Sequence, residues 1–174
     1  MRWFQPKYYV KNFEHISIER LQKAGIRLLL CDIDNTLVSY DEPYPNERVI
    51  QFIDKIQASG IEVALCSNAT KQRATRFSKI LHVSQTYYFS CKPMPFNFRR
   101  AMKEHHLNAN QVALVGDQLF TDILGGNWSG LYTILTAPIS VKDSLPTKIN
   151  RQFEQIIYRY FEKKGILKRG EFDG

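Results

Sequence analysis

The chain carries the stretch LLLCDIDNTL at residues 28–37. A short run of large aliphatic side chains ends abruptly there in two aspartates, Asp32 and Asp34, which stand one residue apart. Such a run predicts a strand buried on both faces, as in a parallel sheet that helices cover on each side. The strand would then deliver both carboxylates to its carboxyl end, where open α/β sheets bind ligands. The alternative is that the aspartates only cap the next turn, which is more usual for one Asp than for two.

Apolar runs and helical patterns alternate along the rest of the chain. Runs at 26–31, 61–66, 87–90, 111–115 and 131–135 predict strands. A short helix between Ser17 and Gly25 and helical patterns at 47–59, 71–81, 95–106, 121–127 and 147–164 lie among and beyond them. This alternation predicts an α/β fold, in which βαβ units build a parallel, doubly wound sheet. We expect one three-layer domain over 1–174, with a motif-bearing core at about 26–140, a basic and aromatic N-terminal arm at 1–16, and a C-terminal amphipathic helix at about 147–164.

Polar residues follow four of these strands. They are Asp32 and Asp34 after the first, Ser67 and Asn68 after the second, Lys92 beyond the third, and Asp117 with Asp122 after the fourth. Because parallel strands end at one edge of a sheet, we expect these side chains to converge there. Several carboxylates around one point suit Mg²⁺, which prefers oxygen ligands. The sequence therefore predicts a site for Mg²⁺ and a phosphate group.

Phosphoryl transfer fits this set of residues. A carboxylate such as Asp32 can attack phosphorus and form an aspartyl-phosphate, which divides a difficult hydrolysis into two displacements. Asp34 can protonate the leaving oxygen and later take a proton from the attacking water. Lys92, the Ser67 hydroxyl and the following backbone amides can stabilise charge on the phosphate. Asn68 offers its amide at a helix start, which is a ready anion site.

Other polar residues near these motifs have structural interpretations. Asn35 and Thr36 are expected to fix the turn after the first strand. Arg73 and Arg76 are expected to lie on a solvated helix face, although a long side chain there can reach an anionic substrate across an open site.

Four motifs in this order resemble those of the haloacid dehalogenase superfamily of aspartate-nucleophile phosphatases. They are DIDNT at 32–36, Ser67 after an apolar strand, Lys92 before a proline, and Gly116-Asp117 with Asp122. The resemblance implies that Asp32 is the nucleophile, Asp34 the acid and base, and Ser67 and Lys92 the phosphate ligands. It also implies Mg²⁺ held by the side chains of Asp32 and Asp117 and the backbone carbonyl of Asp34. Asp122 is either a further ligand or the group that orients the metal water and the lysine.

The spacing of the motifs leaves no room for a cap domain. The next predicted helix starts about ten residues after Leu37, and one helix and a short strand separate Ser67 from Lys92. An uncapped site is open, which favours a phosphate carried by a large molecule. With GDQLFTDILGGN at 116–127, the first motif resembles the capless class IIIA group, which includes the YqeG-type bacterial proteins and the phosphatidylglycerophosphate phosphatases of mitochondria and plastids. This resemblance covers about residues 1–140 and implies a Rossmann-like domain.

Charge and aromatic residues bear on the partner. The net charge is +7, with Lys and Arg denser at both ends, which attracts polyanions including anionic lipid. The N-terminal arm mixes Trp and Tyr with Lys and Arg, as suits a headgroup layer; alternatively it is an edge segment whose aromatic side chains pack on the core. The C-terminal helix carries an apolar stripe that we expect to pack on the core, and the alternative is that this stripe binds a membrane. Its residues are Ile149, Phe153, Ile156, Ile157 and Tyr160.

The sequence thus predicts a Mg²⁺-dependent phosphatase that converts phosphatidylglycerophosphate to phosphatidylglycerol. One alternative keeps the chemistry and changes the substrate to a phosphoprotein, a nucleic acid end or a soluble sugar or nucleotide phosphate. Another is a non-enzymatic basic module that binds RNA. The chain has no zinc-finger spacing or ribonucleoprotein aromatic motif, so nucleic acid is the less favoured partner. The sequence predicts no oligomeric state.

The cysteines and the apolar runs indicate a compartment. Cys31, Cys66 and Cys91 show neither paired spacing nor a C-x-x-C form, which predicts free thiols in a reducing compartment. We expect all three to pack as small apolar side chains at buried strand ends. No apolar run is long enough to span a bilayer, and the N-terminus lacks a secretory apolar core. These features predict a cytoplasmic protein that meets the inner face of the membrane peripherally.

Overall fold

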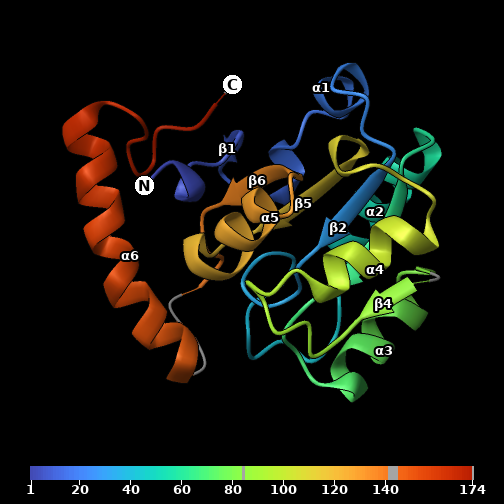
Figure 1. Cartoon of the computed structure of the whole chain (residues 1–174). Helices are drawn as coiled ribbons and strands as arrows, with labels where there is room; N and C mark the ends of the chain where they lie inside the picture. Colours follow the sequence, from blue (N-terminus) through green and yellow to red (C-terminus); the bar gives the residue numbers. More distant parts are fainter. Residues whose placement is uncertain (84, 141–144, 174) are drawn as a thin grey trace.

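A six-stranded parallel sheet forms the centre of the fold (Figure 1). The computed structural model describes residues 1–83, 85–140 and 145–173, and within these ranges the strand order is β1-β6-β5-β2-β3-β4. The strands are β1 (Tyr8–Val10), β2 (Leu28–Cys31), β3 (Glu62–Cys66), β4 (Gln85–Tyr87), β5 (Val112–Gly116) and β6 (Tyr132–Thr136). Every pairing is parallel, so the predicted doubly wound α/β sheet is confirmed.

Helices cover both faces of the sheet. They are α1 (Ile18–Lys23), α2 (Glu47–Ala58), α3 (Lys71–Ile80), α4 (Phe96–Glu104), α5 (Leu124–Trp128) and α6 (Leu145–Lys164), with short turns η1 (Arg2–Phe4), η2 (Phe13–His15), η3 (Ala109–Gln111) and η4 (Leu119–Ile123). Successive strand residues point to opposite faces, so Leu29 packs with α1, α2 and α3 while Leu28 and Leu30 pack with α4. Buried residues of α6 join β1, β6 and η4. The predicted three layers are therefore present.

Local sequence signals set several boundaries as predicted. The Ser17 and Asn46 side chains accept hydrogen bonds from the backbone N–H groups of Arg20 and Val49, and so cap α1 and α2. The chain leaves α1 through Gly25, whose φ of +74° suits a residue without a Cβ atom.

Two strands differ from the sequence prediction. The third predicted strand, at 87–90, begins two residues too late and ends three residues too late, because β4 spans Gln85–Tyr87. The following Phe89 and Cys91 have φ of 43° and 49°, which an extended strand excludes. The N-terminal arm contains the unpredicted edge strand β1, in which Tyr8 and Tyr9 are buried. This part of the arm is thus the core-packed edge segment left open by the sequence.

Side-chain burial also corrects two expectations. Cys31 and Cys66 are buried free thiols as predicted, but Cys91 is an exposed free thiol because it lies in the loop after β4. Of the predicted core-facing stripe on α6, Ile157 is buried, whereas the other four residues are exposed. Among the described residues, no helix has the length and apolar character needed to cross a membrane.

Candidate active site

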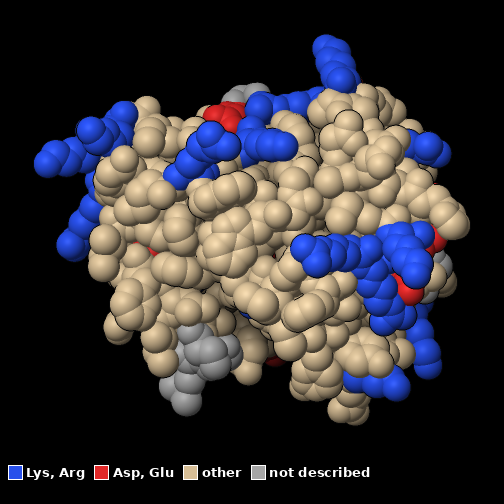
Figure 2. All heavy atoms as spheres, in the orientation of Figure 1, with Lys and Arg blue, Asp and Glu red and all other residues tan. Residues whose placement is uncertain are grey.

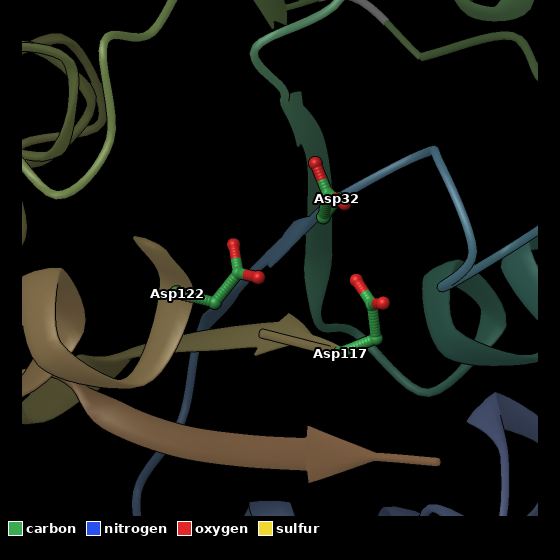
Figure 3. Close-up of side chains that lie close together, drawn as sticks. All are labelled: Asp32, Asp117 and Asp122. Atoms are coloured by element: carbon green, nitrogen blue, oxygen red, sulfur yellow. The ribbon is translucent and has the colours of Figure 1, made fainter. Parts of the chain in front are cut away.

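Three buried carboxylates converge at the carboxyl edge of the sheet (Figure 3). Asp32 follows β2 and Asp117 follows β5, and these strands pair with Cys31 opposite Val115. Asp122 reaches the same point from the helical turn η4. One oxygen from each carboxylate lies within 4.8 Å of the other two. The predicted convergence of Asp32, Asp117 and Asp122 is therefore what the fold produces.

The close approach of Asp122 depends on the glycine at the end of β5. A Cβ atom at Gly116 would lie 2.1 Å from Cγ and 2.4 Å from Cβ of Asp122, which is shorter than any tolerated contact. Asp122 is held in this position because its Oδ2 accepts hydrogen bonds from the Gln118 N–H at 3.1 Å and the Thr121 hydroxyl at 3.3 Å. The fourth motif thus needs glycine at position 116 for a steric reason, since a larger residue would collide with Asp122.

Lys92 joins two of the acids. Its Nζ donates to Oδ1 of Asp32 at 2.7 Å and to Oδ1 of Asp122 at 2.6 Å, and the side chain is buried. Burial lowers the pKa of Lys92, but the charges of Asp122 and Asp32 outweigh this and hold its pKa above the ordinary value. Lys92 is therefore an ammonium ion in this site, and Asp122 fixes its position.

Asp34 stands apart from the buried cluster and faces the opening. Asn35 follows it with a φ of 60°, and the Asn35 N–H donates to the Val38 carbonyl at 2.7 Å, so the chain turns sharply here. Burial and the charge of Asp32 raise the pKa of Asp34 to about 6, against the opposing effect of Arg73, whose Nε donates to Asp34 Oδ1 at 2.8 Å. A carboxyl with this pKa can both give and take a proton near neutral pH.

A cavity of about 420 Å³ lies at the site, and Ser67 and Asn68 line it together with the acids Asp32 and Asp34. The Ser67 hydroxyl accepts a hydrogen bond from the Ala69 N–H at 3.2 Å, and Asn68 Oδ1 accepts one from the Lys92 N–H at 3.0 Å. Asn68 therefore ties the loop after β3 to the loop that carries Lys92. The lining residues are Asp32, Asp34, Asn35, Tyr40, Ser67, Asn68, Ala69, Thr70, Arg73, Lys92, Gln118, Thr121, Thr147 and Asn150.

Sequence reasoning missed two residues of α6, Arg151 and Glu154, that make polar contacts with the site and the adjoining turn η4. Arg151 of α6 forms an ion pair with Asp117 Oδ2 and also donates to the Asp117 carbonyl at 2.9 Å. Glu154, one turn later, accepts hydrogen bonds from the Leu119 N–H at 2.6 Å and the Phe120 N–H at 3.3 Å. No local motif marks either residue, although their three-residue spacing places both on one helix face.

Two sequence interpretations need correction. Thr36 does more than shape a turn, because its hydroxyl lies 3.2 Å from Asp117 Oδ1 and 3.5 Å from Asp32 Oδ2. Arg73 is not a solvated helix residue, since its guanidinium binds Asp34 and donates to the Glu42 carbonyl at 2.6 Å. Both residues help to hold the acids in place.

The acid cluster fits a divalent cation. Burial raises the pKa of Asp117, and although Arg151 lowers it, the charges of Asp122 and Asp32 raise it further. Burial likewise raises the pKa of Asp122, against the opposing charge of Lys92. The raised pKa values of Asp117 and Asp122 mean that the surrounding groups supply too little positive charge to stabilise both carboxylates in their ionised form. Oxygen ligands in this arrangement suit a hard cation, which would favour the ionised forms.

Comparison with known proteins places the chain in a family. A family model described as haloacid dehalogenase-like hydrolase matches residues 1–130. The chain belongs to the haloacid dehalogenase-like hydrolases. It is 37% identical to "Probable phosphatase YqeG" of Bacillus subtilis (strain 168) over 167 residues, which are 96% of each protein. The resemblance found in its motifs is thereby confirmed, and the protein is a phosphatase enzyme.

A more distant sequence relative and two solved structures that share the fold also match the chain. The chain is 26% identical to phosphatidylglycerophosphate phosphatase 1, chloroplastic/mitochondrial, of Arabidopsis thaliana over 176 residues, which cover 92% of this chain but 49% of that protein. A subfamily IIIA hydrolase from Legionella pneumophila shares the fold, with a TM-score of 0.54, 22% identity and coverage of 69% of this chain and 70% of that one. The cobalt-bound form of the deoxy-D-mannose-octulosonate 8-phosphate phosphatase YrbI of Haemophilus influenzae also shares the fold. Its TM-score is 0.53 and its sequence identity 18%, over 64% of this chain and 68% of that one.

Proposed function

We propose that this protein is a Mg²⁺-dependent phosphomonoesterase that works through an aspartyl-phosphate on Asp32, and that its substrate is phosphatidylglycerophosphate. The observation that carries the chemistry is the meeting of Asp32, Asp117, Asp122 and Lys92 at one point of the sheet edge. The Arabidopsis relative supports the substrate, because its name specifies that lipid.

In the first step an oxygen of Asp32 attacks phosphorus. The new Asp32 O–P bond forms as the P–O bond to the leaving group breaks, and the protonated Asp34 carboxyl gives its proton to the leaving alkoxide. Lys92 holds Asp32 at 2.7 Å and keeps a positive charge beside the reacting phosphate. Ser67 lines the cavity, where its hydroxyl would donate to the phosphate.

In the second step water replaces the enzyme oxygen. The Asp34 carboxylate takes a proton from the water, whose oxygen bonds to phosphorus while the P–O bond to Asp32 breaks. Inorganic phosphate leaves, and Asp34 is again protonated for the next cycle. One group thus serves as acid and then as base, which its pKa of about 6 permits.

The proposed metal would be held by the side chains of Asp32 and Asp117 and the backbone carbonyl of Asp34. When bound, Mg²⁺ would supply positive charge that neutralises the phosphate oxygens. Asp122 would act beside it by fixing the ammonium group of Lys92, with which it pairs at 2.6 Å.

The open cavity favours a substrate whose bulk stays outside it. The loop from Val38 to Asn46 and the segment from Ser67 to Lys92 contain no inserted cap among the described residues. The cavity of about 420 Å³ accepts a phosphate and a short polar headgroup, while lipid chains would stay outside. Arg73 lines the cavity too, where its guanidinium holds Asp34.

A direct comparison of substrates tests this function. Phosphate release is measured from phosphatidylglycerophosphate in neutral detergent micelles and from glycerol 3-phosphate, each with Mg²⁺ or with EDTA. We expect kcat/KM to be at least ~10-fold higher for the lipid, since the extra headgroup contacts add to transition-state binding. Activity should disappear with EDTA and return with excess Mg²⁺. Equal slow rates on both esters would reject the lipid substrate, and full activity after chelation would reject the metal requirement.

Replacement of Arg73 should shift the pH dependence. Arg73 lowers the pKa of Asp34, so Arg73→Met raises that pKa and keeps the acid protonated to higher pH. For glycerol 3-phosphate, whose alkoxide needs a proton, the fall of kcat/KM with rising pH should move upward by roughly one pH unit. Arg76→Met is the matched control, because Arg76 donates to the Pro43 carbonyl and is not bonded to Asp34. An unmoved or downward-shifted profile in Arg73→Met would contradict the acid role of Asp34.

A further inference from the structure

Helix α6 has two apolar faces, and the protein covers one of them. Ile157, Tyr158 and Phe161 are buried against β1, β6 and η4. On the other side lie four large residues at spacings of four, three and four, which place them in one line along the helix. This outer stripe consists of Ile149, Phe153, Ile156 and Tyr160, with 57%, 54%, 59% and 37% of each residue exposed.

Polar contacts fix the helix in this orientation. Glu154 is buried and accepts hydrogen bonds from two backbone N–H groups of η4, and Arg151 pairs with Asp117. Turning the outer stripe inward would break these buried contacts, which is strongly unfavourable. The exposure of the outer stripe is therefore a property of the docked helix.

The apolar surface extends beyond α6. The ring of Phe153 lies 6.4 Å from that of Phe120, and the ring of Phe120 lies 5.0 Å from that of Phe4 in the N-terminal arm. Trp3, next to Phe4, is 48% exposed. Phe4 and Phe120 are half-buried, and together with the exposed outer stripe they form an apolar patch of the kind that marks an interaction site.

The charges around the outer stripe are mainly positive. Arg159, Lys163 and Lys164 are exposed near the carboxyl end of α6, and Glu162 is the one exposed acid among the described side chains of the helix. Figure 2 shows Lys and Arg at the margins of a broad field without charged side chains, including the upper left, where α6 ends. Apolar residues flanked by cations are typical of helices that lie on anionic membranes.

We propose that the outer stripe docks the protein onto the surface of an anionic lipid bilayer. The choice of a bilayer rests on the proposed function, since a lipid phosphatase must reach headgroups. Thr147 and Asn150, in the first turns of α6, line the catalytic cavity, so docking through this helix holds the cavity near the membrane surface. A second copy of the chain fits less well as the partner. Among the described side chains, each α6 exposes three cations and one acid, Glu162, so two paired helices would bring together more like charges than opposite ones.

Vesicle flotation tests the docking without any catalytic step. The wild-type protein is mixed with vesicles of phosphatidylcholine and phosphatidylglycerol, or of phosphatidylcholine alone. The variant Ile149→Gln/Ile156→Gln removes apolar area from the outer stripe, and Ile149→Leu/Ile156→Leu keeps it at the same positions. We expect wild type and the Leu variant to float with the anionic vesicles, and the Gln variant to need at least ~10-fold more lipid for half-binding.

Four other measurements separate the possible outcomes. Circular dichroism melting and turnover of glycerol 3-phosphate should be the same in all three proteins, because neither isoleucine touches the cavity. Equal flotation of the Gln and Leu variants, or no flotation of wild type, would overturn the proposal. So would a dimer in sedimentation that the Gln variant abolishes, since a second copy would then cover the stripe. Hydrolysis of the lipid in neutral micelles without vesicle binding would reject the docking alone, and binding without hydrolysis would reject the proposed substrate alone.

Discussion

Asp32→Asn should abolish phosphatase activity and leave the fold intact. Asparagine cannot form the covalent phosphate intermediate, so kcat should fall roughly 10⁴-fold or more, the scale seen when a covalent nucleophile is removed. The fold should survive because the amide oxygen of the introduced asparagine can still accept the hydrogen bond that Lys92 Nζ makes to Asp32 Oδ1. Loss of one negative charge also relieves Asp117 and Asp122, whose pKa values Asp32 raises.

The measurement combines phosphate release with detection of the intermediate. Rapid quenching in acid followed by peptide mass spectrometry should find phosphate on Asp32 in the wild-type protein and none in the variant. Asp54→Asn is the matched control, since it makes the same change on the exposed side of α2 and should leave turnover unaltered. Wild-type rates in Asp32→Asn, or phosphate on another residue, would show that the nucleophile is misassigned.

The convergence of the acids was predictable from the sequence because it needs only strand order and direction. Once the sheet is parallel, residues just beyond strand ends must meet at one edge, whatever their separation in the chain. Asp32 and Asp117 meet for this reason although 85 positions separate their numbers. Burial of the strands on both faces was visible in their continuous apolar runs.

The contribution of α6 was not predictable in the same way. The helix carries apolar residues on two sides, and hydrophobic periodicity shows that a face is apolar without showing which neighbour covers it. The deciding contacts are polar and tertiary: Glu154 binds backbone N–H groups of η4, and Arg151 pairs with Asp117. The prediction of β4 failed for a different reason. The backbone is left-handed at Phe89 and Cys91, and the sequence gives no clear signal of that conformation where the residue is not glycine.

Gly116→Ala should damage both stability and activity. The added Cβ would meet Cγ and Cβ of Asp122 at 2.1 Å and 2.4 Å, so Asp122 must move and its backbone must move with it. Displacement breaks the buried pair with Lys92 at 2.6 Å, a loss of about 3–5 kcal/mol of unfolding free energy. Lys92 then also loses its fixed position beside Asp32, and we expect kcat to fall by roughly 10²-fold even where the protein remains folded.

Denaturant unfolding measures the loss of stability in Gly116→Ala, and turnover of the folded variant measures the loss of activity. Gly60→Ala is the control that separates steric overlap from backbone strain. Gly60 has a φ of +86° and nothing within 4 Å of a built Cβ, so its substitution costs about 1–2 kcal/mol through the left-handed backbone alone and spares activity. Gly116 has no such φ, so its cost arises from contact with Asp122. If Gly116→Ala resembled Gly60→Ala in both measurements, the close approach of Asp122 to β5 would not be what positions Lys92.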